Sequence, residues 1–178
     1  MLLPGSHFPV PALNRSVVLL CLCLLPLFQL QSQQPSTRLQ AGAAAAELQA
    51  DDSMIIAGGI TGYQLQGQEG KLRCVAVVLA LGPQKLAIVA CDVLMMTRQV
   101  LDPVIAEIES ATGISRSNVL INCTHTHHAP STMRVHDYAP DTVFTRRVQE
   151  GIVAAVKSAA SKLGDADFLF ALGEEKTV

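Results

Sequence analysis

The chain has 178 residues, a formal net charge of −2 at pH 7, 4% aromatic residues and no tryptophan. This length suits one domain of ordinary size. The near-neutral charge provides no basic field for nucleic acid, and the scarcity of aromatic side chains argues against stacking platforms for bases or sugars.

The N-terminal segment, residues 1–34, has the features of a targeting sequence. Arg15 precedes the apolar run SVVLLCLCLLPLFQL, and a polar stretch follows it. The run is short for a membrane span, which needs about 20 apolar residues, and Pro26 interrupts it. We predict that residues 1–34 are a signal peptide or an N-terminal anchor. The body, residues 38–178, would then be extracytoplasmic: secreted, periplasmic or held at a membrane by that anchor.

The first half of the body predicts three strands and a long loop. Residues 39–48 are small and apolar and predict a strand, and the Gly-rich, polar residues 51–70 predict a loop. The apolar run 72–81 predicts a strand buried on both faces. A Gly-Pro turn joins it to a returning strand over 85–94, so the pair predicts a β-hairpin.

An amphipathic helix is predicted over residues 97–113. Its apolar residues recur at helical spacing, and Gly113 suits the left-handed position that follows a helix end. Pro103 leaves two alternatives. The helix begins at an Asp102 N-cap with Pro103 as its first residue, or it continues through a kink at Pro103.

The second half predicts two further strands and a second helix. A buried strand is expected over 117–124, a loop over 129–141, a long helix over 142–164 ended by Gly164, and a strand over 166–172. Alternating strands and helices predict an α/β fold, a mixed sheet with flanking helices. Since the sequence stops soon after the last strand, we expect the N-terminal portion of a larger domain.

The body contains three cysteines, Cys74, Cys91 and Cys123, all within apolar strand-like runs. An odd number means that at least one stays free or pairs outside this chain. Core thiols are the favoured interpretation, and no disulfide framework is predicted.

A histidine cluster follows the predicted strand 117–124, in the stretch NVLINCTHTHHAPST. Three imidazoles occupy four positions at the carboxyl end of a strand, the edge where α/β sheets bind ligands. If the extended conformation continues, His125 and His127 lie on one face about 6–7 Å apart and can converge on one Zn²⁺. His128 would point to the other face or help the chain to turn. The alternative is that these rings are hydrogen-bonded, half-buried histidines without a metal.

Three polar residues could support the cluster. The hydroxyls of Thr124 and Thr126 could hydrogen-bond the histidine ring nitrogens and orient them. Asp92 ends the preceding strand and faces the same edge, or else it caps a loop. His128 could contact the substrate or the metal-binding residues.

The segment VACDVLMM, the helix VLDPVIAEIESATG and the strand and loop NVLINCTHTHHAPS resemble the N-terminal catalytic domain of the neutral/alkaline, non-lysosomal ceramidases. The resemblance covers most of residues 40–175, and its one specific motif is THTHHAP. It implies a zinc-dependent amide hydrolase that converts N-acylsphingosine to sphingosine and a fatty acid. It also implies that His125 binds zinc and that His127 is catalytic, contacting the reacting region.

Two departures from the family pattern bear on activity. His128 stands at a position that is serine-like in the family. The remaining zinc ligands of the family (a second His, a Glu and a Tyr) come later in its sequence and have no counterpart before Val178. A catalytic zinc usually has three protein ligands, so this piece is expected to be inactive by itself. A lipid-like amide substrate and contact with a membrane surface are the partners that the resemblance suggests.

Two other functions stay open. An amidohydrolase-type metal hydrolase also places an HxH pair at a strand end, but it needs further His and Asp residues downstream. A non-catalytic, exported metal-binding module would hold a metal through the same histidines. The HxHxDH pattern of metallo-β-lactamases is absent, because HTHHAP has no Asp at the required position.

Overall fold

A mixed sheet of five strands forms the body of the protein in the computed structural model, which describes residues 38–174 and 176. The predicted targeting segment 1–34 lies outside the described residues. The order across the sheet is β4-β3-β2-β1-β5, with β3 and β4 parallel and the other neighbours antiparallel. The strands are β1 (Gln40–Leu48), β2 (Leu72–Leu81), β3 (Gln84–Cys91), β4 (Val119–Cys123) and β5 (Gly164–Asp165).

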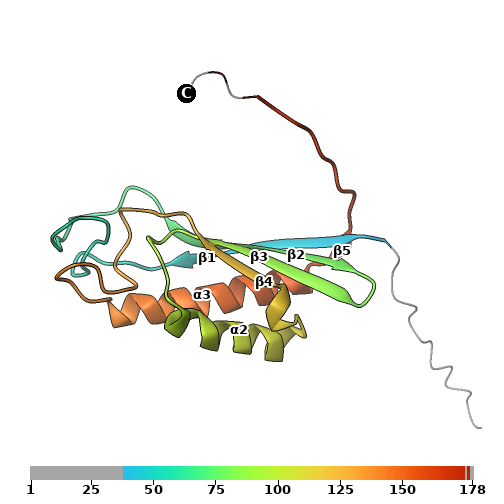
Figure 1. Ribbon diagram of the computed structural model, residues 1–178, viewed down its shortest axis with the longest axis horizontal. Helices are drawn as coiled ribbons and strands as arrows, with labels where there is room; N and C mark the ends of the chain where they lie inside the picture. Colours follow the sequence, from blue (N-terminus) through green and yellow to red (C-terminus); the bar gives the residue numbers. More distant parts are fainter. Residues whose placement is uncertain (1–37, 175, 177–178) are drawn as a thin grey trace, which may run out of the picture. The chain divides into compact units, whose positions relative to one another are not determined.

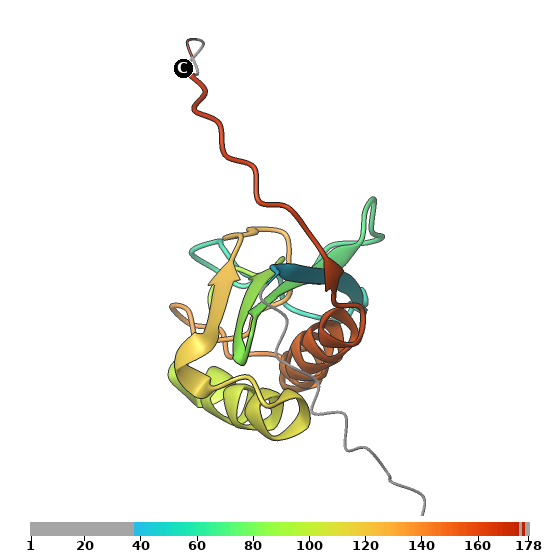
Figure 2. The same cartoon turned by 90° about the vertical axis from the view of Figure 1, so that its right-hand side faces the viewer.

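Two helices lie on one face of this sheet, as Figures 1 and 2 show. Helix α2 (Arg98–Thr112) connects the parallel strands β3 and β4, and a short 3₁₀ turn, η2 (Arg116–Asn118), precedes β4. Helix α3 (Thr142–Ser161) follows the loop after β4. This arrangement confirms the predicted α/β fold with a mixed sheet and flanking helices.

The core lies between the sheet and the two helices, and α2 contributes Val104 and Ile108 to it. The apolar stripe predicted for α3 is largely buried, through Phe144, Val148, Ile152, Val156 and Ala159. Glycine permits the close approach of helix and sheet, because a Cβ at Gly42 would overlap the carbonyl oxygen of Ala159. Strands β1, β3 and β4 run in the same direction, so their carboxyl ends lie at a common edge of the sheet.

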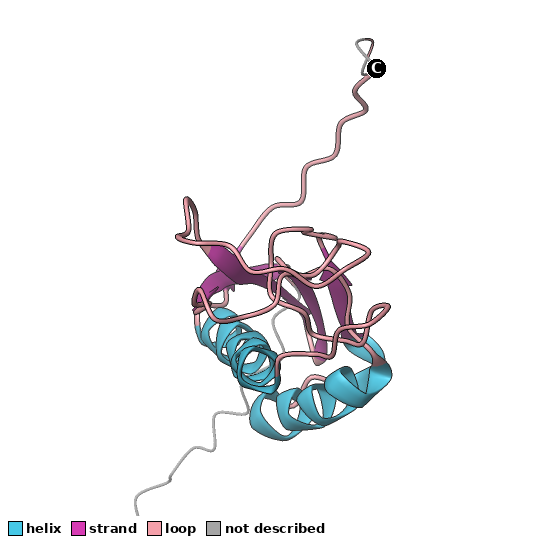
Figure 3. Ribbon diagram, turned by 90° about the vertical axis from the view of Figure 1, so that its left-hand side faces the viewer, coloured by secondary structure: helices cyan, strands magenta, loops and turns pink. Residues whose placement is uncertain are grey.

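The second face of the sheet carries no helix among the described residues, which corrects two predictions (Figure 3). Strand β2 is buried on one face only, with Val75 38% and Leu81 53% exposed. Strand β4 is likewise not fully buried, and Leu120 is 58% exposed. The physical reason is that both helices pack on the same side, so alternate side chains of each strand point away from them.

The ends of several elements differ from the predictions. Helix α2 begins after Thr97 and includes Pro103, so the Asp102 N-cap alternative is wrong. Helix α3 ends at Ser161, before Gly164. The strand expected over 166–172 is absent, because β5 pairs with the first residues of β1 and its continuation runs past the end of that strand. No helix in the described part of the chain is long and apolar enough to cross a membrane.

Candidate functional site

Three loops meet at the edge of the sheet where β1, β3 and β4 end. The loop after β4 continues beside the loop after β3, because Thr124 donates its N–H to Cys91 O at 2.9 Å and Thr126 donates to Val93 O at 3.2 Å. The loop after β1 joins on the other side, where Ala57 donates its N–H to Ala129 O at 2.9 Å. Backbone hydrogen bonds therefore fix the histidine segment between two neighbours that are distant in sequence.

The side chains of His125 and His127 lie against each other within this arrangement. Their ring centroids are 4.7 Å apart, and the rings meet edge to face at 75°. The extended conformation predicted for this segment is wrong, since β4 ends at Cys123 and His125 has a φ of 63°. A left-handed conformation is uncommon for a residue with a side chain, and such outliers concentrate at functional sites.

A backbone carbonyl lies at the Nδ1 atom of each ring. His125 Nδ1 is 3.1 Å from Leu94 O, and His127 Nδ1 is 3.2 Å from Gly58 O. A carbonyl can only accept, so these contacts select the tautomer that carries the proton on Nδ1. The Nε2 atom of each ring then keeps its lone pair for a metal or for a proton.

Sequence reasoning missed the residues that hold the rings in this way. Tyr138 is buried, accepts a hydrogen bond from Gly58 N at 3.0 Å and donates one to Gly59 O at 3.1 Å. Gly58 has a φ of 104°, and a Cβ there would lie 2.5 Å from His127 Nδ1. The only signal in the sequence was the Gly58-Gly59 pair, which suggested a close backbone approach without naming its partner.

The supporting roles expected of the hydroxyl and carboxyl groups take a different form. The Thr124 and Thr126 hydroxyls contact each other at 2.8 Å, and Thr124 Oγ1 also lies 3.2 Å from Asp92 Oδ1. Asp92 Oδ2 accepts from the Arg73 N–H at 3.0 Å. The expected hydrogen bonds from the threonines to the ring nitrogens are replaced by the carbonyl contacts. Asp92 thus ties the end of β3 to its two neighbours.

His128 belongs to different surroundings from the other two histidines. It lines a cavity of about 580 Å³ together with the loop 65–72 and residues 50–52, Ile56 and Pro130. His136, in the loop before α3, is exposed and has a φ of 48°. The structure therefore brings His125 and His127 together and leaves the other described histidines apart.

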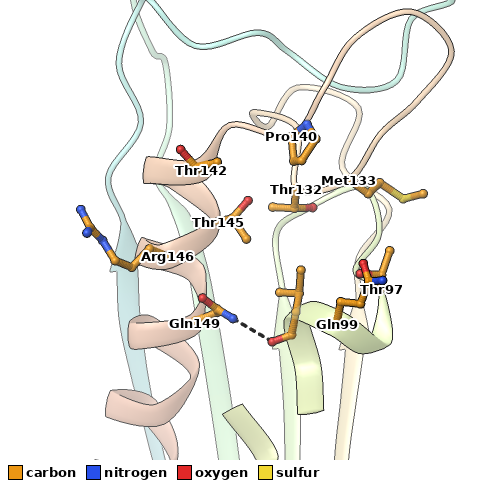
Figure 4. Close-up of a pocket in the computed structure, with 10 residues that line it drawn as sticks. Thr97, Gln99, Thr132, Met133, Pro140, Thr142, Thr145, Arg146 and Gln149 are labelled. Atoms are coloured by element: carbon orange, nitrogen blue, oxygen red, sulfur yellow. Dashed lines mark hydrogen bonds between the residues drawn. The ribbon is translucent and has the colours of Figure 1, made fainter. Parts of the chain in front are cut away.

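A second, smaller cavity of about 220 Å³ lies between the first turns of α2 and α3 (Figure 4). Thr97, Thr132, Thr145 and Gln149 are among its lining residues, and Arg146 is its one charged side chain. Gln149 donates a hydrogen bond across it to Val100 O at 2.9 Å. None of the three histidines of the motif lines this cavity, so it is separate from the candidate site.

The histidine pair has side chains of the type that bind metal ions, with the Nε2 atom of each ring left available by the contact at Nδ1. Two imidazoles held by carbonyls on Nδ1 suit Zn²⁺, because that contact orients the ring and raises the basicity of the ligating nitrogen. Within the described residues, no group of three or more His, Cys, Asp or Glu side chains is placed to hold a metal ion. A complete catalytic zinc site therefore needs at least one ligand from elsewhere.

Comparison with known proteins shows the fold. No protein-family model matches the chain, and no curated protein matches it. The crystal structure of neutral ceramidase from Pseudomonas aeruginosa is similar at a TM-score of 0.65 and 19% identity, and a structure of ceramidase complexed with C2 at 0.64 and 20%. Each similarity covers 73% of this chain and 22% of the other. The chain thus has a ceramidase-like fold and spans about a fifth of the length of those proteins.

Proposed function

We propose that the chain is the N-terminal part of an exported, zinc-dependent amide hydrolase of the neutral ceramidase type. The observation that carries the proposal is the contact between His125 and His127, with the Nδ1 atom of each ring at a backbone carbonyl. The ceramidase-like fold supports the same assignment, as does the THTHHAP motif at the carboxyl end of β4.

The two histidines take different roles in this proposal. His125 is the zinc ligand, through Nε2, with its ring oriented by Leu94 O. His127 is the catalytic residue that contacts the reacting amide, and Gly58 O holds its ring against that of His125. When bound, zinc supplies Lewis-acid polarisation of the amide carbonyl or activation of a water molecule. The further ligands come from a part of the protein outside the described residues.

The proposed substrate class is a lipid-like amide, N-acylsphingosine, cleaved to sphingosine and a fatty acid. This assignment comes from the resemblance and from the fold of the ceramidases. The open cavity beside His128 is about 580 Å³, which falls in the range of small-molecule sites. Its lining includes the apolar side chains of Ile56, Leu65, Leu72 and Pro130.

Zinc content is the first test. The body from Arg38 and a longer form of the protein are purified from the same host, and their zinc is measured by elemental analysis. Stoichiometric zinc in the longer form alone, with hydrolysis of N-acylsphingosine, is the expected result. If neither form contains zinc, the histidine pair does not bind this metal and the proposal is overturned. Zinc without hydrolysis would favour the non-catalytic metal-binding module.

Variants in the longer form assign the residues. His125→Ala is expected to abolish zinc binding and activity together, because it removes a ligand. His127→Ala is expected to retain zinc and lose most activity. His136→Ala is the matched control, since His136 is an exposed loop histidine that the structure leaves apart from the pair. Equal, small losses in all three variants would contradict the assigned roles.

A further inference from the structure

Three cysteines lie in a row across the sheet, on adjacent strands. The strand registers place Cys74 of β2 opposite Cys91 of β3, and Cys91 opposite Cys123 of β4. Cys74 and Cys91 are fully buried in the core, and Cys123 is part-buried. The sequence spacing alone did not reveal this alignment, because the register of the strands creates it.

The Cys74 and Cys91 sulfur atoms are in direct contact, 2.9 Å apart. The neighbouring pair Arg73 and Asp92 is hydrogen-bonded, since Asp92 donates its N–H to Arg73 O at 2.9 Å. Hydrogen-bonded and non-hydrogen-bonded pairs alternate in an antiparallel ladder, so Cys74 and Cys91 occupy a non-hydrogen-bonded position. The Cα atoms of such a pair are about 4.5 Å apart, within the range that a disulfide spans.

We propose that Cys74 and Cys91 form a cross-strand disulfide that joins β2 to β3, while Cys123 stays a thiol. The antiparallel contact distinguishes this pairing from the rival Cys91–Cys123 pairing across the parallel strands. The hairpin turn brings the two residues together with a sequence separation of only 17. The bond requires neither a metal nor a substrate.

Thiol–disulfide exchange with a small-molecule disulfide such as oxidised glutathione supplies the oxidant. One cysteine thiolate attacks glutathione disulfide, forms a mixed disulfide and releases one glutathione thiolate. The second cysteine thiolate then attacks the cysteine sulfur of the mixed disulfide and displaces the other glutathione. Two protein thiols lose two electrons and two protons, and two glutathione thiols are formed.

Burial dictates when this exchange takes place. The hydrogen bond with the Cys74 thiol, together with desolvation, raises the pKa of the Cys91 thiol. Neither sulfur is exposed in the folded protein. Because the thiolate is the reactive form, exchange is slow once the core has closed. The disulfide therefore forms while the hairpin assembles, before α3 covers it.

The disulfide would also stabilise the edge that carries the histidine loop. Cys91 O accepts hydrogen bonds from Thr124 N at 2.9 Å and from Thr124 Oγ1 at 3.2 Å. His125 follows directly. A covalent link between Cys91 and β2 would restrain the end of β3, to which the histidine loop is hydrogen-bonded.

Peptide mapping tests the proposal on the full chain, because trypsin places Cys74, Cys91 and Cys123 on separate peptides: residues 74–85, 86–98 and 117–134. The other two cysteines of the chain, Cys21 and Cys23, fall together on a fourth peptide, residues 16–38. The reduced, unfolded protein is refolded in a glutathione redox buffer, quenched in acid, alkylated under denaturing conditions and digested. The expected result is a disulfide-linked pair of peptides 74–85 and 86–98. Its mass should be the sum of the two reduced peptide masses less two hydrogen atoms. Peptide 117–134 should be alkylated.

Two variants provide matched controls. Cys123→Ser should leave the linked peptides unchanged, whereas Cys91→Ser should abolish them. Circular dichroism verifies that each variant has refolded. If Cys74 and Cys91 of the refolded wild-type protein are both alkylated after denaturation, or if a linked peptide contains Cys123, the proposal is overturned.

Discussion

Gly58 is the backbone position at which a single methyl group should disturb the candidate site most directly. Its φ of 104° disfavours any residue with a side chain, and a Cβ there would lie 2.5 Å from His127 Nδ1 and 2.7 Å from His127 Cγ. Gly58→Ala therefore has two separate effects, backbone strain and displacement of the His127 ring. Gly67 separates them, because it has a φ of 78° and no atom within 4 Å of its Cβ position.

The expected magnitudes follow from these contacts. Backbone strain at a positive φ costs about 1–2 kcal/mol and applies to both alanine variants. Gly58→Ala also breaks the hydrogen bond between His127 Nδ1 and Gly58 O, which contributes about 0.5–1.5 kcal/mol. We expect a loss of about 1–2 kcal/mol for Gly67→Ala and about 1.5–3.5 kcal/mol for Gly58→Ala.

Urea unfolding followed by circular dichroism measures both free energies, and NMR of the imidazole protons reports ring position. Only Gly58→Ala should shift the His127 resonances and weaken the contact with His125. In a His127→Gly background, Gly58→Ala should cost no more than Gly67→Ala, because the ring and the Cβ that would lie 2.9 Å away are both gone. Equal free energies for the two single variants, with unchanged His127 resonances, would refute the close approach on which the site depends.

Three further predictions concern a helix cap, a strained backbone and a carboxylate. Asp141→Ala removes the N-cap hydrogen bond to Phe144 N and should cost about 0.5–2 kcal/mol in urea unfolding. Thr97→Ala is the control with little effect, because the Thr97 side chain makes no cap hydrogen bond. His125→Gly should be more stable than His125→Ala by about 1 kcal/mol, because glycine tolerates the φ of 63° that alanine does not; equal stabilities would contradict the strain. Hydrogen bonds from Ser53 and the charge of Arg147 lower the pKa of Asp51, so Asp51→Asn should destabilise the protein at neutral pH. The difference in unfolding free energy between the two proteins should vanish as the pH falls below 3.8 and through the pKa of Asp51 in the folded protein. Urea unfolding curves at neutral pH and in acid measure this difference, and a difference that persists in acid would contradict the prediction.

The sequence predicted the elements whose signals are local. Alternating and continuous apolar runs located β1, β2 and β3 within a few residues, and the short Gly-Pro turn made β2 and β3 a hairpin. The apolar stripe of α3 was predicted because helical spacing and burial coincide there. These signals depend on side-chain chemistry within a few residues, so one chain is sufficient to detect them.

Some local signals were overridden by packing. Strand β2 has an apolar sequence on both faces, yet only one face meets the helices, because the side on which a helix packs is decided by the whole chain. The run after Gly164 has strand-like composition, but beyond Asp165 it forms no strand pairing with any other described segment. A strand needs a partner for its backbone groups, and composition alone does not provide one.

The histidine site was predicted in part. The sequence singled out His125 and His127, and the loop geometry of the tertiary structure brought their rings into contact despite a non-extended backbone. Their hydrogen-bond partners lie 31 and 69 residues away, at Leu94 and Gly58, and no local pattern encodes such a separation.

The sequence by itself determined which residue types stand at the sheet edge: three histidines, two threonines and a carboxylate that follow predicted strands. Only the tertiary structure decided which of them meet, which face of the sheet is covered and which cysteines touch. The physical reason is that periodicity and turn chemistry act over a few residues. Strand register, by contrast, and the contacts of carbonyl groups are settled when segments distant in sequence pack together.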